Sequence, residues 1–436
     1  MSADAVGARS RHRTTADGPD RDVRAVRADR AVRFVMPGGV DDPTSPSGGN
    51  IYDRRMCREL PRIGWQVHEH AVAGAWPRPG AGPRSELARG LRESADGSLV
   101  LLDGLVACGV PDVVVPEADR LRLAVLVHLP LGDETGLAPA VAAELDAAER
   151  TTLRAAAVVV APGEWAARRL VEHHGLDPRR VHAAAPGADP APLAPGTATG
   201  APALPGPGAA RNGPARNGDT RKSDMRKSDM RKSEARSGAA RDGSAPRLLC
   251  VASVTPRKGQ HLLIEALASL AGLPWTCELV GGTGHAPAYA ARLRELIGEH
   301  GLGERVHLAG PRSGPALNAS YAAADLLVLA SHTETYGMVA TEALARGVPV
   351  VATAAGGLPE AVGRAPDGSV PGTLVPPGDP AALAAALRRW LTEPGERHRS
   401  KTAARRRRTA LAGWETTSRN LARALEQLRN NPLEAV

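Results

Sequence analysis

The chain has 436 residues, of which 42% are hydrophobic but only 3% aromatic, with 55 Lys and Arg against 47 Asp and Glu. This length is enough for two or three domains, and so few aromatic side chains argue against a protein that stacks single-stranded nucleic acid. The formal charge of +8 comes from three basic segments, 1–30, 194–246 and 397–408. Because the rest of the chain is mildly acidic, we expect no nucleic-acid partner.

The cysteines and the N-terminal region indicate a cytoplasmic protein. Cys57, Cys108, Cys250 and Cys277 are scattered without a CxxC pair, so they suggest neither a zinc site nor a disulfide framework and fit a reducing compartment. No run of about eighteen apolar residues occurs, and no apolar segment follows Met1. We therefore expect neither a spanning helix nor a secretion signal.

Predicted strands and helices alternate after a polar segment. Residues 1–30 lack hydrophobic periodicity and are predicted to form a disordered tail. The strands that follow are expected at 32–36, 65–72, 99–102, 123–128, 157–160 and 181–184, and the helices at 51–62, 86–93, 137–153 and 164–174. Asn50 is a candidate N-cap for the helix at 51–62. Such alternation predicts a parallel sheet with helices on both faces, here a Rossmann-like domain over 31–190.

A low-complexity segment separates this domain from a second one. Residues 191–246 are rich in Ala, Pro, Gly, Arg and Ser and contain a tandem RKSDM repeat, so we expect a linker. The second series has strands at 248–254, 276–280, 306–309, 326–330 and 349–352 and helices at 260–270, 287–300, 317–323 and 338–346. It predicts a second Rossmann-like domain over 247–395, giving an α/β protein. In the final segment, 396–436, apolar residues share one helical face: Leu411, Trp414, Leu421, Leu425 and Leu428.

The segment 331–350 has the most informative chemistry. Glu334 follows an apolar strand, and Glu342 comes eight positions later on the next helix. That loop lies at the carboxyl end of the strand, where open α/β sheets bind ligands. The N–H groups near Tyr336, Gly337 and Met338 begin the helix and favour an anion such as a diphosphate. Glu342 could then accept hydrogen bonds from a ribose, unless it is an ordinary surface residue of an Ala-rich helix.

Three further features lie at predicted strand ends. Arg257 and Lys258 open a helix after an apolar strand, and Lys258 suits phosphate oxygens, although a solvated lysine explains it equally well. Gly49 belongs to a glycine-rich loop after the first strand, where backbone can approach a pyrophosphate. His128 ends the strand LAVLVH, so it is a candidate site residue, though lone histidines are more often structural.

Together these motifs resemble a known family. ETYGMVATEALARGVPVVATAAGGLPE, with VTPRKG, the glycine-rich first loop and APGAD at 185–189, is similar to the retaining family-4 glycosyltransferases of the glycosyltransferase-B fold. The resemblance implies two Rossmann-like domains facing each other across a cleft, with the C-terminal helix crossing back to the first domain. It covers about 31–190 loosely and 246–395 closely.

The resemblance also implies roles for individual residues. Glu342 would bind the donor ribose, and Lys258 the diphosphate. Glu334 and the backbone after it would bind the transferred sugar and the diphosphate, and His128 the sugar near the reacting carbon. The remaining donor-binding positions are Gly49 beside the phosphates, Arg257, and the segment Thr335, Tyr336, Gly337 and Met338. Gly356 and Gly357 would lie close to the sugar.

One position departs from the family pattern. The family has an arginine five positions before the lysine, and here that position is Ser253. Either Arg257 substitutes for it from another angle or phosphate binding is weaker. The only Asp-x-Asp motif lies in the tail, at Asp20 and Asp22, so no metal is expected and no cofactor beyond the nucleotide sugar. A dinucleotide fingerprint fails in VGGTGHAP, since Pro287 stands where the third glycine belongs.

The sequence therefore predicts transfer of a hexose or N-acetylhexosamine from a nucleoside diphosphate sugar, with retention, to a small-molecule or lipid-linked acceptor. Two alternatives stay open: a phosphorylase or epimerase of similar fold, and a non-catalytic nucleotide-sugar-binding protein. The arginines at 54, 55, 58 and 62 and at 405–408 fit either a solvated helix face or a peripheral contact with the membrane.

Overall fold

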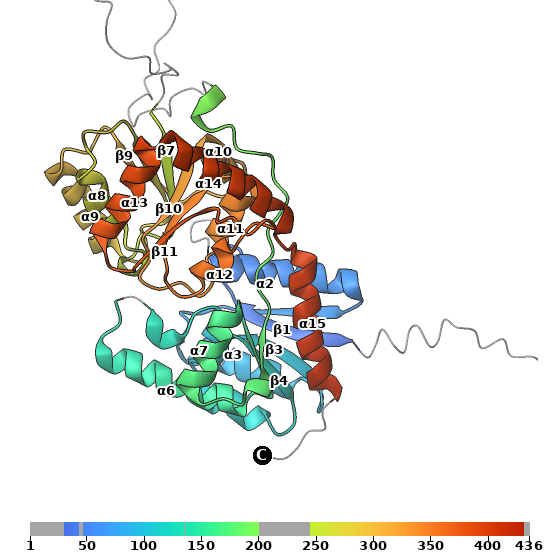
Figure 1. The fold of residues 1–436 in the computed structure, drawn as a ribbon. Helices are drawn as coiled ribbons and strands as arrows, with labels where there is room; N and C mark the ends of the chain where they lie inside the picture. Colours follow the sequence, from blue (N-terminus) through green and yellow to red (C-terminus); the bar gives the residue numbers. More distant parts are fainter. Residues whose placement is uncertain (1–29, 43–46, 135, 200–244, 431–436) are drawn as a thin grey trace, which may run out of the picture.

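The computed structural model describes residues 30–42, 47–134, 136–199 and 245–430, which form two lobes (Figure 1). Nearly all of the predicted tail, 1–30, and most of the predicted linker, 200–244, lie outside these residues. Residues 191–199 of that linker are described, and they lie against the second lobe: the N–H of Ala194 donates to the carbonyl of Arg346 (2.8 Å).

The first lobe is a six-stranded parallel sheet in the order β2-β1-β3-β4-β5-β6. Its strands are β1 (Ala31–Pro37), β2 (Gln66–Val72), β3 (Leu99–Asp103), β4 (Arg122–Leu126), β5 (Val158–Ala161) and β6 (Val181–Ala183). The helices are α2 (Gly48–Glu59), α3 (Ala81–Arg92), α4 (Gly104–Ala107), α5 (Pro111–Val114), α6 (Pro139–Ala155) and α7 (Glu164–His174). The central strands are nearly continuous apolar runs because helices cover both faces of the sheet.

The second lobe repeats this architecture in the strand order β12-β11-β10-β7-β8-β9. Its strands are β7 (Arg247–Val251), β8 (Thr276–Val280), β9 (Val306–Gly310), β10 (Leu326–Leu329), β11 (Val350–Thr353) and β12 (Gly372–Val375). The helices are α8 (Gln260–Ala268), α9 (Pro287–Glu299), α10 (Gly314–Ala323), α11 (Met338–Ala345), α12 (Leu358–Val362), α13 (Pro380–Thr392) and α14 (Pro394–Arg407). The predicted α/β class with two Rossmann-like domains is confirmed.

Several predicted boundaries are wrong for local reasons. Helix α2 begins at Gly48 because Ser47, and not Asn50, is its N-cap: the Ser47 hydroxyl accepts from the N–H of Asn50 (3.0 Å). Strand β4 ends at Leu126, so His128 lies in the loop that follows the strand. No helix or strand was predicted between 353 and 395, where the structure has α12, β12 and α13.

The last helix, α15 (Trp414–Asn430), crosses back to the first lobe, as the resemblance implied (Figure 1). Trp414, Leu421 and Leu425 enter the apolar core of that lobe, and the Thr417 hydroxyl donates to the carbonyl of Ala185 (2.8 Å). Leu411 is an exception to the predicted common face, because it precedes the helix and packs on the core of the second lobe. The chain thus changes lobes within a few residues.

The basic residues of α2 and α14 are largely engaged within the protein. Arg54 pairs with Asp41 and Glu69, and Arg55 pairs with Asp189. In α14 and just after it, Arg406 pairs with Asp367, and Arg408 donates to the carbonyls of Ala345 and Ala191. These contacts account for much of the basic clustering. Among the described residues, the length and hydropathy that a membrane-crossing helix requires are not found together in any helix.

Candidate functional site

In the second lobe, Glu334 lies in the loop that connects β10 to α11. Its side chain is buried, and Oε1 accepts hydrogen bonds from Lys258 Nζ (2.5 Å) and from the Ser331 hydroxyl (2.9 Å). Burial raises the pKa of Glu334, but Lys258, Arg257 and Ser331 together outweigh that effect and hold the pKa below its usual value. The result is a carboxylate and an ammonium held together at the carboxyl edge of the sheet.

Gly356 and Gly357 pack against the backbone of this loop. The N–H of Gly357 donates to the carbonyl of Glu334 (2.8 Å). Gly356 has a φ of 57°, and a Cβ built on it would lie 1.9 Å from the Glu334 carbonyl oxygen. No other residue fits this left-handed backbone at such close approach. The pair therefore fixes the backbone of the Glu334 loop, while its predicted proximity to a sugar stays a prediction.

Helix α11 begins directly after this loop with no side-chain cap. Its N-cap is Gly337 in the left-handed region (φ 101°), and Met338 is the first helical residue. The uncapped N–H groups and the helix dipole favour an anion at this end. Tyr336 is 9% exposed, and burial raises its pKa to about 12, so its phenol belongs to the core and only its backbone can serve a ligand. Thr335 lies half-buried beside it.

Glu342 lies on α11 and is oriented by a tyrosine. The Tyr321 hydroxyl donates to Oε2 of Glu342 (2.7 Å), and the guanidinium of Arg346 lies 4.6 Å from the centre of the Tyr321 ring. Burial raises the pKa of Glu342, an effect that Tyr321 and Arg346 only partly offset. Glu342 is therefore a positioned, partly desolvated acceptor and not the freely solvated surface residue that the alternative interpretation required.

The two predicted cations lie on the turn that follows β7. Lys258 precedes Gly259, whose φ is 64°, and a Cβ on that glycine would lie 2.1 Å from the carbonyl oxygen of Ala330. This close packing places Lys258 beside the β10 loop. Arg257 Nη1 donates to the carbonyl of Thr333 (3.3 Å), and its charge contributes to lowering the pKa of Glu334. Ser253 lies earlier in the same turn, where its carbonyl accepts from Gln260 Nε2 (2.9 Å).

In the first lobe, His128 is backed by two buried carboxyls. Its Nε2 lies 2.7 Å from Asp53 Oδ1 and 3.9 Å from Asp103 Oδ2. Burial raises the pKa of Asp53 to about 7 and that of Asp103 well above its usual value, and burial lowers the pKa of His128. Burial thus favours the neutral form of the imidazole and of both carboxyls.

Glycines at the start of α2 connect the two halves of the site. A Cβ built on Gly49 would lie 2.9 Å from Cδ2 of His128, and one built on Gly48 would lie 3.5 Å from Sδ of Met338. Met338 packs against the cores of both lobes. His128 and Met338, the first residue of α11, therefore both lie against the start of α2.

A second contact joins the lobes beside this site. The carboxylate of Glu360, in α12, accepts from the N–H groups of Glu164 and Trp165 (3.2 Å each) at the start of α7. A Cβ on Gly163 would lie 3.0 Å from the Glu360 oxygens, so the small residue permits the approach. Because α12 follows Gly357 directly, the contact couples the Glu334 loop to the first lobe.

Residues 231–407 match the family model described as glycosyl transferases group 1. The match covers most of the second lobe, from β7 to α14. The chain is 33% identical over 281 residues to a D-inositol 3-phosphate glycosyltransferase of Kineococcus radiotolerans, covering 62% of this chain and 57% of that protein. It is 34% identical over 265 residues to one of Geodermatophilus obscurus, covering 59% of this chain and 50% of that protein. The chain thus spans about half the length of the curated relatives it matches.

Solved structures superpose on both lobes together. Sucrose-phosphate synthase from Thermosynechococcus elongatus superposes with a TM-score of 0.67 at 22% identity, covering 92% of this chain and 99% of that one. Anabaena HepE, solved in complex with UDP and glucose, gives 0.63 at 18%, covering 91% and 100%. This likeness confirms the glycosyltransferase-B fold.

Asp53, Asp103 and Tyr321 contact the predicted site residues but were not predicted from the sequence. Asp103 carried a signal, because it is the one polar residue that ends the fully buried strand LVLLD. Asp53 and Tyr321 lie within helices, and the sequence does not show which distant residue each contacts. The resemblance led to His128, Lys258, Glu334 and Glu342, but not to the residues that hold them.

Proposed function

We propose that the protein transfers a hexose or N-acetylhexosamine from a nucleoside diphosphate sugar to an acceptor hydroxyl, with retention of the anomeric configuration. The observation that carries the proposal is the group formed by Lys258, Glu334 and the uncapped N-terminus of α11. Glu342 lies one helical turn further along α11. This group combines a fixed cation and free N–H donors with acceptors for sugar and ribose hydroxyls. A nucleoside diphosphate sugar needs all three.

The donor would lie with its diphosphate on Lys258 and the N–H groups of Gly337 and Met338. Negative charge develops on the leaving diphosphate as the glycosidic bond breaks, so donors already fixed in place stabilise the transition state most. Arg257 lies on the same turn as Lys258 and contacts the Glu334 loop, which supports it as the second cation where Ser253 replaces the family's arginine. No cofactor and no metal enter this proposal.

The transferred sugar would lie between Glu334 and His128. Neutral His128, held by Asp53, offers a hydrogen bond to a sugar hydroxyl near the reacting carbon without placing a second positive charge beside an oxocarbenium-like centre. The departing phosphate itself would take the acceptor's proton, as the family resemblance implies. Contacts between lobes at Glu360 and Met338 would exclude water that hydrolyses the donor.

Two comparisons indicate which substrates to test first. Anabaena HepE was solved with UDP and glucose, which supports a UDP-sugar as donor. The curated relatives are named D-inositol 3-phosphate glycosyltransferases, so that polyol phosphate is the first acceptor to test. A lipid-linked acceptor is the alternative within the same proposal.

The test follows product formation by proton NMR with UDP-glucose or UDP-N-acetylglucosamine and D-inositol 3-phosphate, followed by lipid-linked acceptors. We expect a new α-linkage from an α-linked donor and loss of turnover in Lys258→Ala, while the exposed Glu415→Ala control stays active. Sugar phosphate formed with inorganic phosphate would instead identify a phosphorylase, and donor isomerised without acceptor an epimerase. Donor binding without turnover on any acceptor would favour the non-catalytic alternative.

A further inference from the structure

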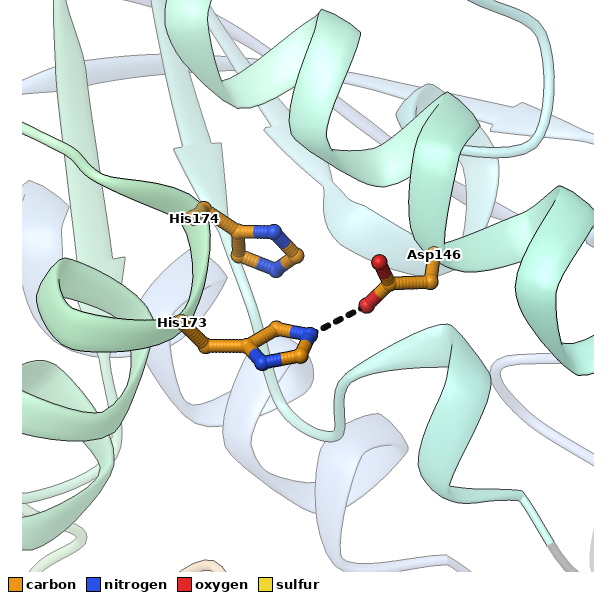
Figure 2. Close-up of side chains that lie close together, drawn as sticks. All are labelled: Asp146, His173 and His174. Carbon is orange, nitrogen blue, oxygen red and sulfur yellow. Dashed lines mark hydrogen bonds and ion pairs between the residues drawn. The ribbon is translucent and has the colours of Figure 1, made fainter.

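The middle of α6 and the C-terminal end of α7 bring a carboxylate and two histidines together (Figure 2). His173 and His174 are the last residues of α7, which ends at Gly175 in the left-handed conformation (φ 63°). Asp146 projects from α6 and accepts from Nε2 of His173. Figure 2 shows both imidazole rings and the carboxylate turned toward one common space.

These side chains have the donor types and spacing of a transition-metal site. One nitrogen of each histidine and one oxygen of Asp146 all lie within 4.8 Å of one another. Zinc bonds of about 2.0–2.2 Å place tetrahedral ligands about 3.3 Å apart. His173 and Asp146 must therefore separate slightly and the whole group contract by up to about 1.5 Å. The His173 side chain is 42% exposed, so it is free to make this adjustment.

The buried environment of His174 is a second, independent observation. His174 is 1% exposed; its Nε2 pairs with Oε2 of Glu149 (3.1 Å), and its Nδ1 has no partner among the described residues. An unpaired buried nitrogen is costly. Histidine ligands commonly use one ring nitrogen for the metal and donate the other N–H to a carboxylate. Glu149 is itself fully buried and is held by the N–H of Leu131 (3.3 Å).

The charges around the cluster are balanced before any ion is added. Asp146 and Glu149 contribute two carboxylates, while Arg150 binds the second oxygen of Asp146 (3.1 Å) and Arg154 binds the carbonyl of His174. Arg150 thereby orients the carboxylate without occupying Oδ1. A plain ion pair between Asp146 and His173 would explain those two side chains, but it would leave Nδ1 of His174 unused.

We propose that Asp146, His173 and His174 bind one Zn²⁺, with Glu149 orienting His174 from outside and water completing the coordination. The role is structural. Helix α7 has 11 residues, so about 15 Å separates its metal end from Glu164 at its start. That start is where Glu360 of the second lobe docks, and the metal would anchor the opposite end of α7 to α6.

The test uses the full chain, stripped with EDTA, dialysed and titrated with ZnCl₂ by calorimetry. We expect one equivalent of Zn²⁺ to bind and to raise the melting temperature, and Co²⁺ in its place to give the visible absorption of a four-coordinate site. His173→Ala and Asp146→Asn should lose this equivalent, and Glu149→Gln should weaken binding about 10- to 100-fold. The exposed His300→Ala, on another helix end, should bind as the wild type does.

Two results would overturn the proposal. One is a stripped wild-type chain that takes up no Zn²⁺ at micromolar concentration. The other is an equivalent of Zn²⁺ that persists unchanged in both His173→Ala and Asp146→Asn, which would place the ligands elsewhere. His173→Ala is the safer variant for folding because its side chain is partly exposed, and the melting temperature of each metal-free variant shows whether the fold is intact.

Discussion

Replacing Glu342 by alanine tests the donor site most directly. The carboxylate is fixed by Tyr321 through a 2.7 Å hydrogen bond, and the proposal gives it two ribose hydroxyls. Hydrogen bonds to a charged group are worth about 1.5–3 kcal/mol each. Taking the lower figure for both, Glu342→Ala should lose about 3 kcal/mol, which is about 150-fold in the dissociation constant for UDP.

The assay is calorimetric titration of wild type and variant with UDP and with 2′,3′-dideoxy-UDP. The dideoxy nucleotide lacks the hydroxyls in question, so its affinity for the wild type should already be low and should not fall further in Glu342→Ala. Equal loss of both nucleotides in the variant would show that Glu342 acts on the fold of the pocket and would refute the ribose assignment. Tyr321→Phe is the matched control, because it keeps the carboxylate but removes its hydrogen bond, and a smaller loss is expected.

Burial also gives this interaction a pH dependence. The raised pKa of Glu342 means that its carboxylate takes up a proton at a higher pH than an exposed glutamate does. UDP affinity of the wild type should therefore fall as the solution becomes mildly acidic, before ordinary glutamates titrate. Glu342→Ala should lack this component of the pH profile.

Three further predictions concern the residues that hold the site. The pKa of Asp53 is about 7 in the folded chain and about 4 in the unfolded chain. The stability that its protonated form contributes is therefore fully present below pH 4 and is lost as the pH rises through 7. Relative to Asp53→Asn, the wild type's free energy of unfolding, measured in urea, should thus fall by about 1.4 kcal/mol per pH unit in that window and then level off. Gly356→Ala places a Cβ 1.9 Å from the Glu334 carbonyl and should abolish UDP binding even if the chain stays folded by circular dichroism; unchanged affinity would contradict the packing. Glu360→Ala removes the acceptor for two N–H groups of α7, so this contact between the lobes should weaken by about 0.5–2 kcal/mol. The radius of gyration measured by X-ray scattering should then increase, whereas Glu415→Ala should leave it unchanged.

The strands and helices that were predicted correctly are those that a local pattern of apolar residues marks in the sequence. Apolar strands such as LVLLD and LLVL indicated both sheets. The glutamate pair pointed to the sheet edge where Lys258 and Glu334 meet, and its role in donor binding stays a prediction. Predicted boundaries were wrong where a single side chain fixes the end of a helix, as Ser47 does at the N-terminus of α2. Pairings across long separations, such as His128 with Asp53 and Glu360 with α7, depend on how the helices dock. Neither periodicity nor spacing encodes that.

The crossing of α15 also sets an order on how the protein can assemble. Its apolar residues complete the core of the first lobe, yet Thr417 and the Ala185 carbonyl it binds are 232 positions apart in the chain. During synthesis the first lobe must therefore wait, with an uncovered apolar surface around Phe34 and Tyr52, until the whole second lobe has been made. Ribosome-bound chains that stop before Trp414 should expose that surface to chaperones. The two lobes would then complete their shared fold only after α15 has been made.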